Sequence, residues 1–132
     1  HHVAALMGGD VVAVAPTGSG KTLAFLLPIA RRLRTEPPPR PKNGRVDPMH
    51  RLRAVVLAPT RELAQQIARE AEWVFGGTVL RVCCAYGKSA IGPQKTELRN
   101  GVDLLVATPG RLRELLEVDA CSLRWPSPRP MP

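Results

Sequence analysis

Short apolar runs rich in β-branched residues alternate with longer helical patterns along this chain, and this alternation limits the folds open to it. Four runs have the length and composition of buried strands, namely 10–15, 54–58, 79–85 and 102–107. The stretches with apolar residues at helical spacing are 21–34, 61–75, 93–100 and 109–117. Alternating strands and helices predict parallel strands joined by right-handed crossovers. We therefore predict an α/β fold with a mostly parallel sheet.

Two proline-rich stretches interrupt or end this pattern. The first contains the run Pro37-Pro38-Pro39-Arg40-Pro41, and the second has a proline at every second position from Pro126 onward. Segments with so few bulky apolar side chains cannot join a hydrophobic core. We expect one domain over residues 1–118, with a basic proline-rich insertion at 35–52 and a disordered tail at 119–132.

The positive charge of the chain is concentrated around the expected insertion. The formal net charge of the 132 residues is +8. Residues 31–53 hold eight basic and two acidic side chains, a net +6, whereas residues 54–118 hold eight basic and seven acidic ones, a net +1. A basic chain often binds nucleic acid, but a proline-rich basic loop is more often a solvated segment. The net charge alone therefore assigns no partner.

Several classes of protein are disfavoured by simple features of the sequence. No apolar run approaches the roughly 20 residues of a membrane helix, and residues 1–15 lack the basic start of a secretory leader. Three cysteines, an odd number, suit a reducing compartment. Cys83 and Cys84 are adjacent on an expected strand, so they point to opposite faces and cannot grip one metal ion. We expect a soluble intracellular protein, nuclear or cytoplasmic.

The most specific chemical signal follows the first expected strand and opens the first expected helix. Residues 15–22 read Ala-Pro-Thr-Gly-Ser-Gly-Lys-Thr, which departs from the P-loop pattern only in having Ala15 where glycine is usual. In such a loop backbone N–H groups converge on phosphate oxygens, Lys21 reaches the β- and γ-phosphates, and Thr22 ligates Mg²⁺. We predict a nucleotide site made of Ala15, Pro16, Thr17, Gly18, Ser19, Gly20, Lys21 and Thr22, in which Lys21 and Thr22 are the catalytic residues.

Two further strands end in corners that open helices. Thr60 and Thr108 are expected to be the helix N-caps, and Pro109 occupies a first helical position, where a missing N–H costs nothing. Because parallel strands end on one edge, both corners and the P-loop should line the same rim of the sheet. Either corner alone is explained by a capping threonine and a solvated arginine. Together, with Arg61 and Arg111 near the helix starts, they favour a polyanion along that rim.

Three strings make the chain resemble one family of enzymes. APTGSGKT at 15–22, APTRELAQQI at 58–67 and ATPGRL at 107–112 look like the first, Ia and Ib motifs of DEAD-box ATP-dependent RNA helicases. Tyr86-Gly87-Lys88, followed by Gly92-Pro93-Gln94, resembles the double-glycine segment of that family and the glutamine beyond it, with Lys88 where a second glycine is expected. The resemblance covers about residues 3–124 and implies part of a RecA-like P-loop NTPase domain, a three-layer sandwich.

The resemblance also implies ligands. It assigns 17–22 to ATP and Mg²⁺. It assigns single-stranded or duplex RNA to Pro59, Thr60, Arg61, Glu62, Gly87, Thr108, Pro109, Gly110 and Arg111. Contacts to phosphates and riboses predict binding that is independent of RNA sequence and sensitive to salt.

The acidic Asp-Glu-Ala-Asp motif of such helicases is absent from these residues, and a second motor domain is absent too. We therefore expect a truncated motor domain, inactive alone, of a parent that couples ATP hydrolysis to RNA unwinding or remodelling. A small-molecule P-loop kinase is disfavoured, because nothing in the sequence suggests a lid segment or acidic residues for a small-molecule substrate. A catalytically inactive ATP- or RNA-binding module stays open. So does a non-functional product with an exposed apolar sheet edge.

Overall fold

The computed structural model describes residues 21–35, 52–121 and 123. In chain order the elements are α2 (Lys21–Thr35), β1 (Ala54–Leu57), α3 (Arg61–Val74), β2 (Val82–Ala85), α4 (Ile91–Arg99), β3 (Leu104–Ala107) and α5 (Pro109–Glu117). The predicted strand at 10–15, the insertion from 36 to 51 and most of the predicted tail lie outside the described residues.

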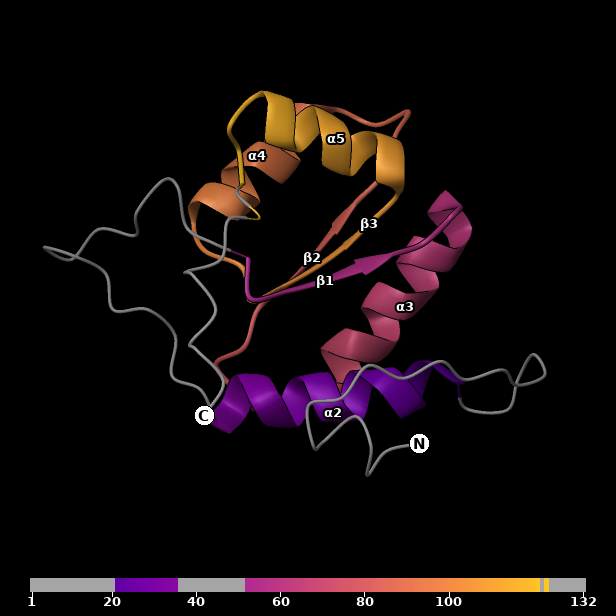
Figure 1. Ribbon diagram of the computed structural model, residues 1–132, viewed down its shortest axis with the longest axis vertical. Coiled ribbons are helices and arrows are strands. Elements are labelled where there is room, and N and C mark those ends of the chain that lie inside the picture. Colours follow the sequence, from indigo (N-terminus) through magenta and orange to yellow (C-terminus); the bar gives the residue numbers. More distant parts are fainter. Residues whose placement is uncertain (1–20, 36–51, 122, 124–132) are drawn as a thin grey trace, which may run out of the picture.

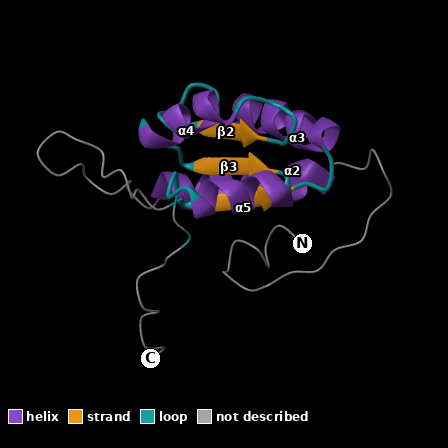
Figure 2. Ribbon diagram, turned by 90° about the horizontal axis from the view of Figure 1, so that it is seen from above, coloured by secondary structure: helices purple, strands orange, loops and turns teal. Residues whose placement is uncertain are grey.

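The described strands form one parallel sheet in the order β1-β3-β2. β3 is central: Leu104 pairs with Ala54 of β1 on one side and with Val82 of β2 on the other. Helices α2 and α3 cover one face and α4 and α5 cover the other, while β2 and β3 point in the same direction (Figures 1 and 2). The predicted α/β class with a parallel sheet is confirmed. The apolar composition expected of a strand buried on both faces is found in β3, whose four residues are all buried.

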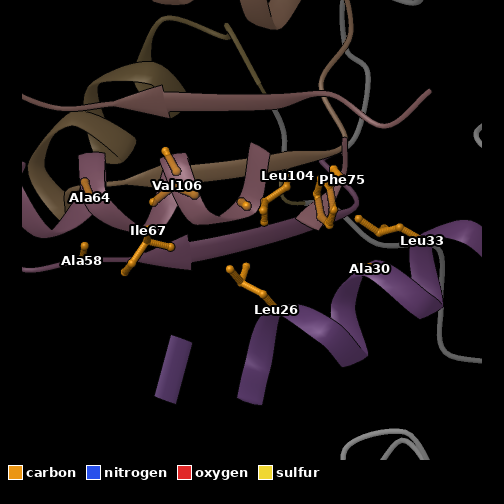
Figure 3. Packing of buried hydrophobic residues seen from close by; sticks show 11 residues of the cluster. Leu26, Ala30, Leu33, Ala58, Ala64, Ile67, Phe75, Leu104 and Val106 are labelled. Carbon is orange, nitrogen blue, oxygen red and sulfur yellow. The ribbon is translucent and has the colours of Figure 1, made fainter. Parts of the chain in front are cut away.

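Alternate residues of β3 belong to two separate hydrophobic cores, one on each face of the sheet. Leu104 and Val106 face the α2 and α3 side, where they pack with Leu26 and Ile67 (Figure 3). Leu105 faces the α4 and α5 side. Because successive side chains of a strand point to opposite faces, a wholly apolar strand is what a sheet covered on both sides requires.

The adjacent cysteines follow the same rule. Cys83 is buried in the core beneath α4 and α5, and Cys84 packs on the opposite core. The Cys83 thiol donates to the Glu97 carboxylate, with 3.2 Å between Sγ and Oε2. Burial, with the carboxylate beside it, raises the pKa of Cys83 well above that of a free thiol. The thiol therefore stays protonated at neutral pH and packs as a small apolar group.

Several boundaries differ from the predicted ones. β2 begins at Val82 rather than at 79, because Val79 is 87% exposed and the Arg81 N–H donates to the Asp103 side chain instead of to a ladder. β3 begins at Leu104, two residues late. α4 starts at Ile91, two residues early, and Pro93 lies in its first turn, where the missing N–H breaks no helical bond.

The core also extends past both predicted proline-rich boundaries. Leu52, placed in the insertion by sequence, is 2% exposed and packs in the core below α4 and α5. Ala120 and Cys121, placed in the tail, are buried in the same core. α5 ends in a Schellman motif, in which Asp119 has a φ of 55° and the Ala120 N–H donates to the Leu115 carbonyl at 2.9 Å. That turn returns the chain to the core.

A half-buried ion pair fixes the amino edge of the sheet and the end of α2. Arg53 donates to the Asp103 carboxylate at 2.9 Å and to the Leu33 carbonyl at 2.8 Å. The C-terminal end of α2 therefore lies at the start of β1, and α2 runs antiparallel to that strand (Figure 3). Its first residue, Lys21, accordingly lies toward the carboxyl edge of the sheet. Within the described segments, no helix has both the length and the apolar character of a bilayer span.

Neighbouring leucines of α2 allow a matched test of this packing. Leu26 is fully buried and Leu27 is 45% exposed. We expect Leu26→Ala to lower the free energy of unfolding by about 2–5 kcal/mol, since it leaves a cavity between α2 and the sheet. Leu27→Ala should cost less than about 1 kcal/mol, because most of its surface is already in water. Urea unfolding followed by circular dichroism measures both, and equal losses would contradict the described burial.

Candidate nucleic-acid interface

The carboxyl ends of the three described strands lie in one row. Leu57 of β1 and Ala85 of β2 both pair with Ala107 of β3. The ladder continues one step further: the Ala58 N–H donates to the Ala107 carbonyl at 2.9 Å, and the Thr108 N–H donates to the Ala85 carbonyl at 3.0 Å. The predicted placement of both helix-opening corners on one edge is confirmed, and the segment after β2 joins them there.

The corner after β1 is exposed and capped as predicted. Thr60 has extended φ and ψ of −129° and 156°, and its hydroxyl accepts a hydrogen bond from the Leu63 N–H at 3.2 Å. Pro59, Arg61 and Glu62 are all exposed. Within the described residues the N–H groups at the first two helical positions are left without an intrahelical partner, as at any helix start.

The corner after β3 also has an N-cap residue with an extended backbone, but it has no side-chain cap. Thr108 occupies the N-cap position with φ and ψ of −78° and 146°, yet its hydroxyl makes no capping hydrogen bond, which differs from the expectation. Pro109 and Gly110 are exposed. Among the described residues, the N–H groups of Gly110 and Arg111 find no hydrogen-bond partner. Free donors at a helix start are suited to an anion.

Two glycines of the rim have open space beside them. A Cβ built on Gly87 or on Gly110 would meet no atom of the described residues within 4 Å other than those of its chain neighbours or its own helix backbone, and neither residue has a positive φ. The protein's own packing and backbone therefore do not require glycine at these positions. Lys88, in contrast, has a φ of 60°, a left-handed conformation that favours glycine. This conformation accounts for the glycine expected there from the sequence pattern.

Arg61, the exposed arginine of the corner after β1, lies against the segment that follows β2. The guanidinium carbon of Arg61 is 4.7 Å from the centroid of the Tyr86 ring, a cation–π contact. The contact joins α3 to the 86–90 loop across the rim. It also leaves the guanidinium edge, whose N–H groups are its hydrogen-bond donors, available to a ligand.

Arg111, in the corner after β3, is placed differently from the expectation. Only 6% of Arg111 is exposed, so its guanidinium does not stand on the rim. Nη1 donates to Gln94 Oε1 at 3.0 Å and Nη2 donates to the Ser89 carbonyl at 2.9 Å. Nε lies 3.6 Å from the Glu114 carboxylate and, within the described part of the chain, has no hydrogen-bond partner.

Sequence reasoning did not assign Ser89 to the site, and it noted Gln94 only as part of the family resemblance, without a role. Gln94 is 8% exposed on α4, where an apolar residue would be expected to face the core. Its amide donates to the Ser89 hydroxyl at 3.0 Å. The available signal for Gln94 was its place in the segment that resembles the family's double-glycine motif. The sequence alone does not show which face of α4 is covered, and so did not show that Gln94 is buried.

The predicted nucleotide-binding loop is described only at its end. Residues 15–20 lie outside the described part, as does the side chain of Lys21. α2 begins at Lys21, and Thr22 is half-buried in its first turn, which contains no acidic residue. The start of a helix without a carboxylate in that turn is favourable for a phosphate.

Known proteins resemble this chain in sequence and in fold. The sequence profile of the DEAD/DEAH box helicase family matches residues 2–125. The chain is 46% identical over 111 residues to the pre-mRNA-processing ATP-dependent RNA helicase PRP5 of Lodderomyces elongisporus, covering 84% of this chain and 10% of that protein. It is 42% identical over 120 residues to the ATP-dependent RNA helicase DBP2 of Mycosarcoma maydis, covering 91% of this chain and 20% of that protein.

Solved structures agree. The yeast DEAD-box splicing factor Prp28 superposes with a TM-score of 0.70 at 39% identity, over 84% of this chain and 25% of that one. A DEAD box protein from the hyperthermophile Methanococcus jannaschii superposes with a TM-score of 0.74 at 32% identity, over 92% of this chain and 30% of that one. The chain thus spans a tenth to a fifth of the two curated relatives and about a quarter to a third of the solved chains.

The two corner threonines provide a test of the described caps. We expect Thr60→Ala to lower the free energy of unfolding by about 1 kcal/mol, because the Leu63 N–H loses its acceptor. Thr108→Ala should change it by less than about 0.5 kcal/mol, since no capping bond is lost. Thermal and urea unfolding of both variants, with Thr60→Ser as the control that keeps the hydroxyl, measure the difference. A larger loss for Thr108→Ala would contradict the geometry.

Proposed function

Because the chain belongs to the DEAD/DEAH box helicase family, we propose that it is part of the first motor domain of an ATP-dependent RNA helicase. The whole protein hydrolyses ATP and uses the energy to unwind or remodel RNA inside the cell, in the nucleus or the cytoplasm. The observation that carries the proposal is the shared edge: both helix-opening corners leave the sheet in one row, with free backbone donors at a helix start.

The proposed RNA surface comprises the exposed corner residues and the open glycines. Its members are Pro59, Thr60, Arg61, Glu62, Gly87, Thr108, Pro109 and Gly110. Arg111, whose side chain is buried, would contribute only its backbone N–H. Gly87 and Gly110 leave room for a sugar-phosphate backbone to approach the main chain, which is the use of glycine where neither packing nor φ requires it. Arg61 supplies a positive charge at the rim, and the α5 start supplies N–H donors.

The proposed nucleotide site comprises residues 15–22, with Lys21 and Thr22 at the start of α2. The Lys21 ammonium would neutralise the β- and γ-phosphates and the Thr22 hydroxyl would hold Mg²⁺. Mg²⁺ held there would offset the negative charge that develops during phosphoryl transfer. The antiparallel course of α2, fixed by the bond between Arg53 and the Leu33 carbonyl, directs this helix start toward the edge that carries the proposed RNA surface.

ATP binding by these 132 residues can be tested separately from turnover. We expect the polypeptide to bind a fluorescent ATP analogue with Mg²⁺, and Lys21→Ala to weaken binding by about tenfold or more, because the phosphates lose their cation. Lys95→Ala on α4 is the matched control and should bind normally. Hydrolysis stimulated by RNA should stay at the buffer level, since no Asp-Glu motif is present in these residues. Robust turnover that Lys21→Ala abolishes would contradict this assignment, and equal binding by both variants would refute the nucleotide site.

RNA binding is tested by its salt dependence. We expect a labelled single-stranded oligouridylate and a labelled oligoadenylate to bind with similar affinity, because backbone contacts carry no sequence information. Arg61→Met should weaken binding and reduce the slope of log K against log salt by about 0.7, the value for one phosphate contact on a single strand. Arg113→Met is the control, since Arg113 is exposed and pairs with Glu117 on α5. No measurable binding to either RNA would refute the proposed surface.

A further inference from the structure

The burial of Arg111, at the start of α5, suggests a role other than direct contact with a ligand. We propose that Arg111 is a positioning residue for RNA binding: its guanidinium holds the 86–90 loop against the start of α5, so that the rim meets RNA as one preformed surface. This inference rests on the proposed function. It replaces a direct side-chain contact between Arg111 and phosphate with an action through Ser89 and Gln94.

The hydrogen bonds of Arg111 reach two other segments at once. Nη1 binds Gln94 of α4 and Nη2 binds the Ser89 carbonyl in the loop after β2. Gln94 in turn donates to the Ser89 hydroxyl, and that hydroxyl donates to the Tyr86 carbonyl at 2.8 Å. Ser89 is therefore held from both its backbone and its side chain. The guanidinium fork supplies two parallel donors in one plane, a geometry that a lysine ammonium cannot reproduce.

The loop held in this way contains a strained residue. Lys88 adopts a φ of 60°, which a residue with a Cβ enters at a cost. Such a conformation persists where its surroundings over-determine it. The bonds to Ser89, the next residue, provide that constraint. Without Arg111, the loop would be free to relax and Gly87 would move with it.

The same set of contacts extends to Arg61, in the corner after β1. Tyr86, whose carbonyl accepts from Ser89, carries the ring beneath the Arg61 guanidinium. We call Arg61, Tyr86, Ser89, Gln94 and Arg111 the rim network. It links the segments that follow all three described strands. A surface ordered before binding loses less conformational freedom when RNA binds, so the network should raise affinity without adding a phosphate contact.

Salt dependence separates a positioning role from a direct one. A side chain that neutralises a phosphate contributes about 0.7 to the slope of log K against log salt on single-stranded RNA. A side chain that acts through Ser89 and Gln94 contributes affinity but no slope. The charge of Arg111 is already directed at the protein, because the guanidinium is 6% exposed and Glu114 lies 3.6 Å from Nε.

The deciding variant, Arg111→Lys, keeps the positive charge of the side chain and removes the planar guanidinium with its paired N–H donors. We expect Arg111→Lys to weaken binding of the labelled oligouridylate by about tenfold with an unchanged salt slope. Gln94→Leu, which removes the acceptor on α4, should reproduce that loss. The double variant should be no more than about twofold weaker than either single one, because both act through one network. Arg113→Lys, on the exposed face of α5, is the matched control and should bind as the unaltered chain does.

Amide hydrogen exchange provides a readout that needs no RNA. In Arg111→Lys and in Gln94→Leu the amides of residues 86–91 should exchange at least about tenfold faster, while those of α3 keep their protection. If the unaltered chain binds no RNA, the proposed function fails, and the exchange data still decide whether Arg111 holds the loop.

Three results would overturn the positioning role. Arg111→Lys could bind RNA like the unaltered chain, which would show that charge alone suffices. The slope of Arg111→Met could fall by about 0.7, which would make Arg111 a phosphate ligand. Exchange in 86–91 could stay unchanged in both loop variants, which would show that the loop does not depend on these bonds.

Discussion

The structure depends on the parallel hydrogen-bond register that joins β1, β3 and β2. Because Leu57, Ala107 and Ala85 end the strands in one row, the segments that follow them emerge side by side although they are far apart in the chain. The register is stabilised by a central strand that is buried on both faces and so feeds two cores. Any change that shifts β3 by one residue would exchange its two buried faces and separate the corners.

The two ends of the sheet use charge in different ways. At the amino edge, Arg53 and Asp103 brace the strands and the end of α2 through bonds to the Leu33 carbonyl and the Arg81 N–H. At the carboxyl edge, Arg61 lies exposed over Tyr86, whereas Arg111 is turned into the protein. Two arginines near the starts of helices, one at the first position of α3 and one at the third position of α5, therefore serve different purposes: Arg61 faces the proposed ligand and Arg111 organises the surface that meets it.

Local chemistry predicted most of the elements and left their ends uncertain. The Thr60 cap and Pro109 at a first helical position follow from side-chain types that favour those positions whatever surrounds them. The start of β2 at Val82 does not, because the Arg81 N–H is diverted by Asp103, a residue 22 positions away. Leu52 and Ala120 were likewise assigned to solvated segments, and only contacts with distant helices bury them.

The sequence by itself determined the fold class, the family and which residue types open each helix, because periodicity and short motifs are local properties of the chain. The tertiary structure decided how those residues are used. Whether Arg111 faces solvent or Ser89 and Gln94 depends on how α4 and α5 pack against the 86–90 loop. That packing is set by the summed burial of many side chains from separate segments, and no single stretch of sequence contains it.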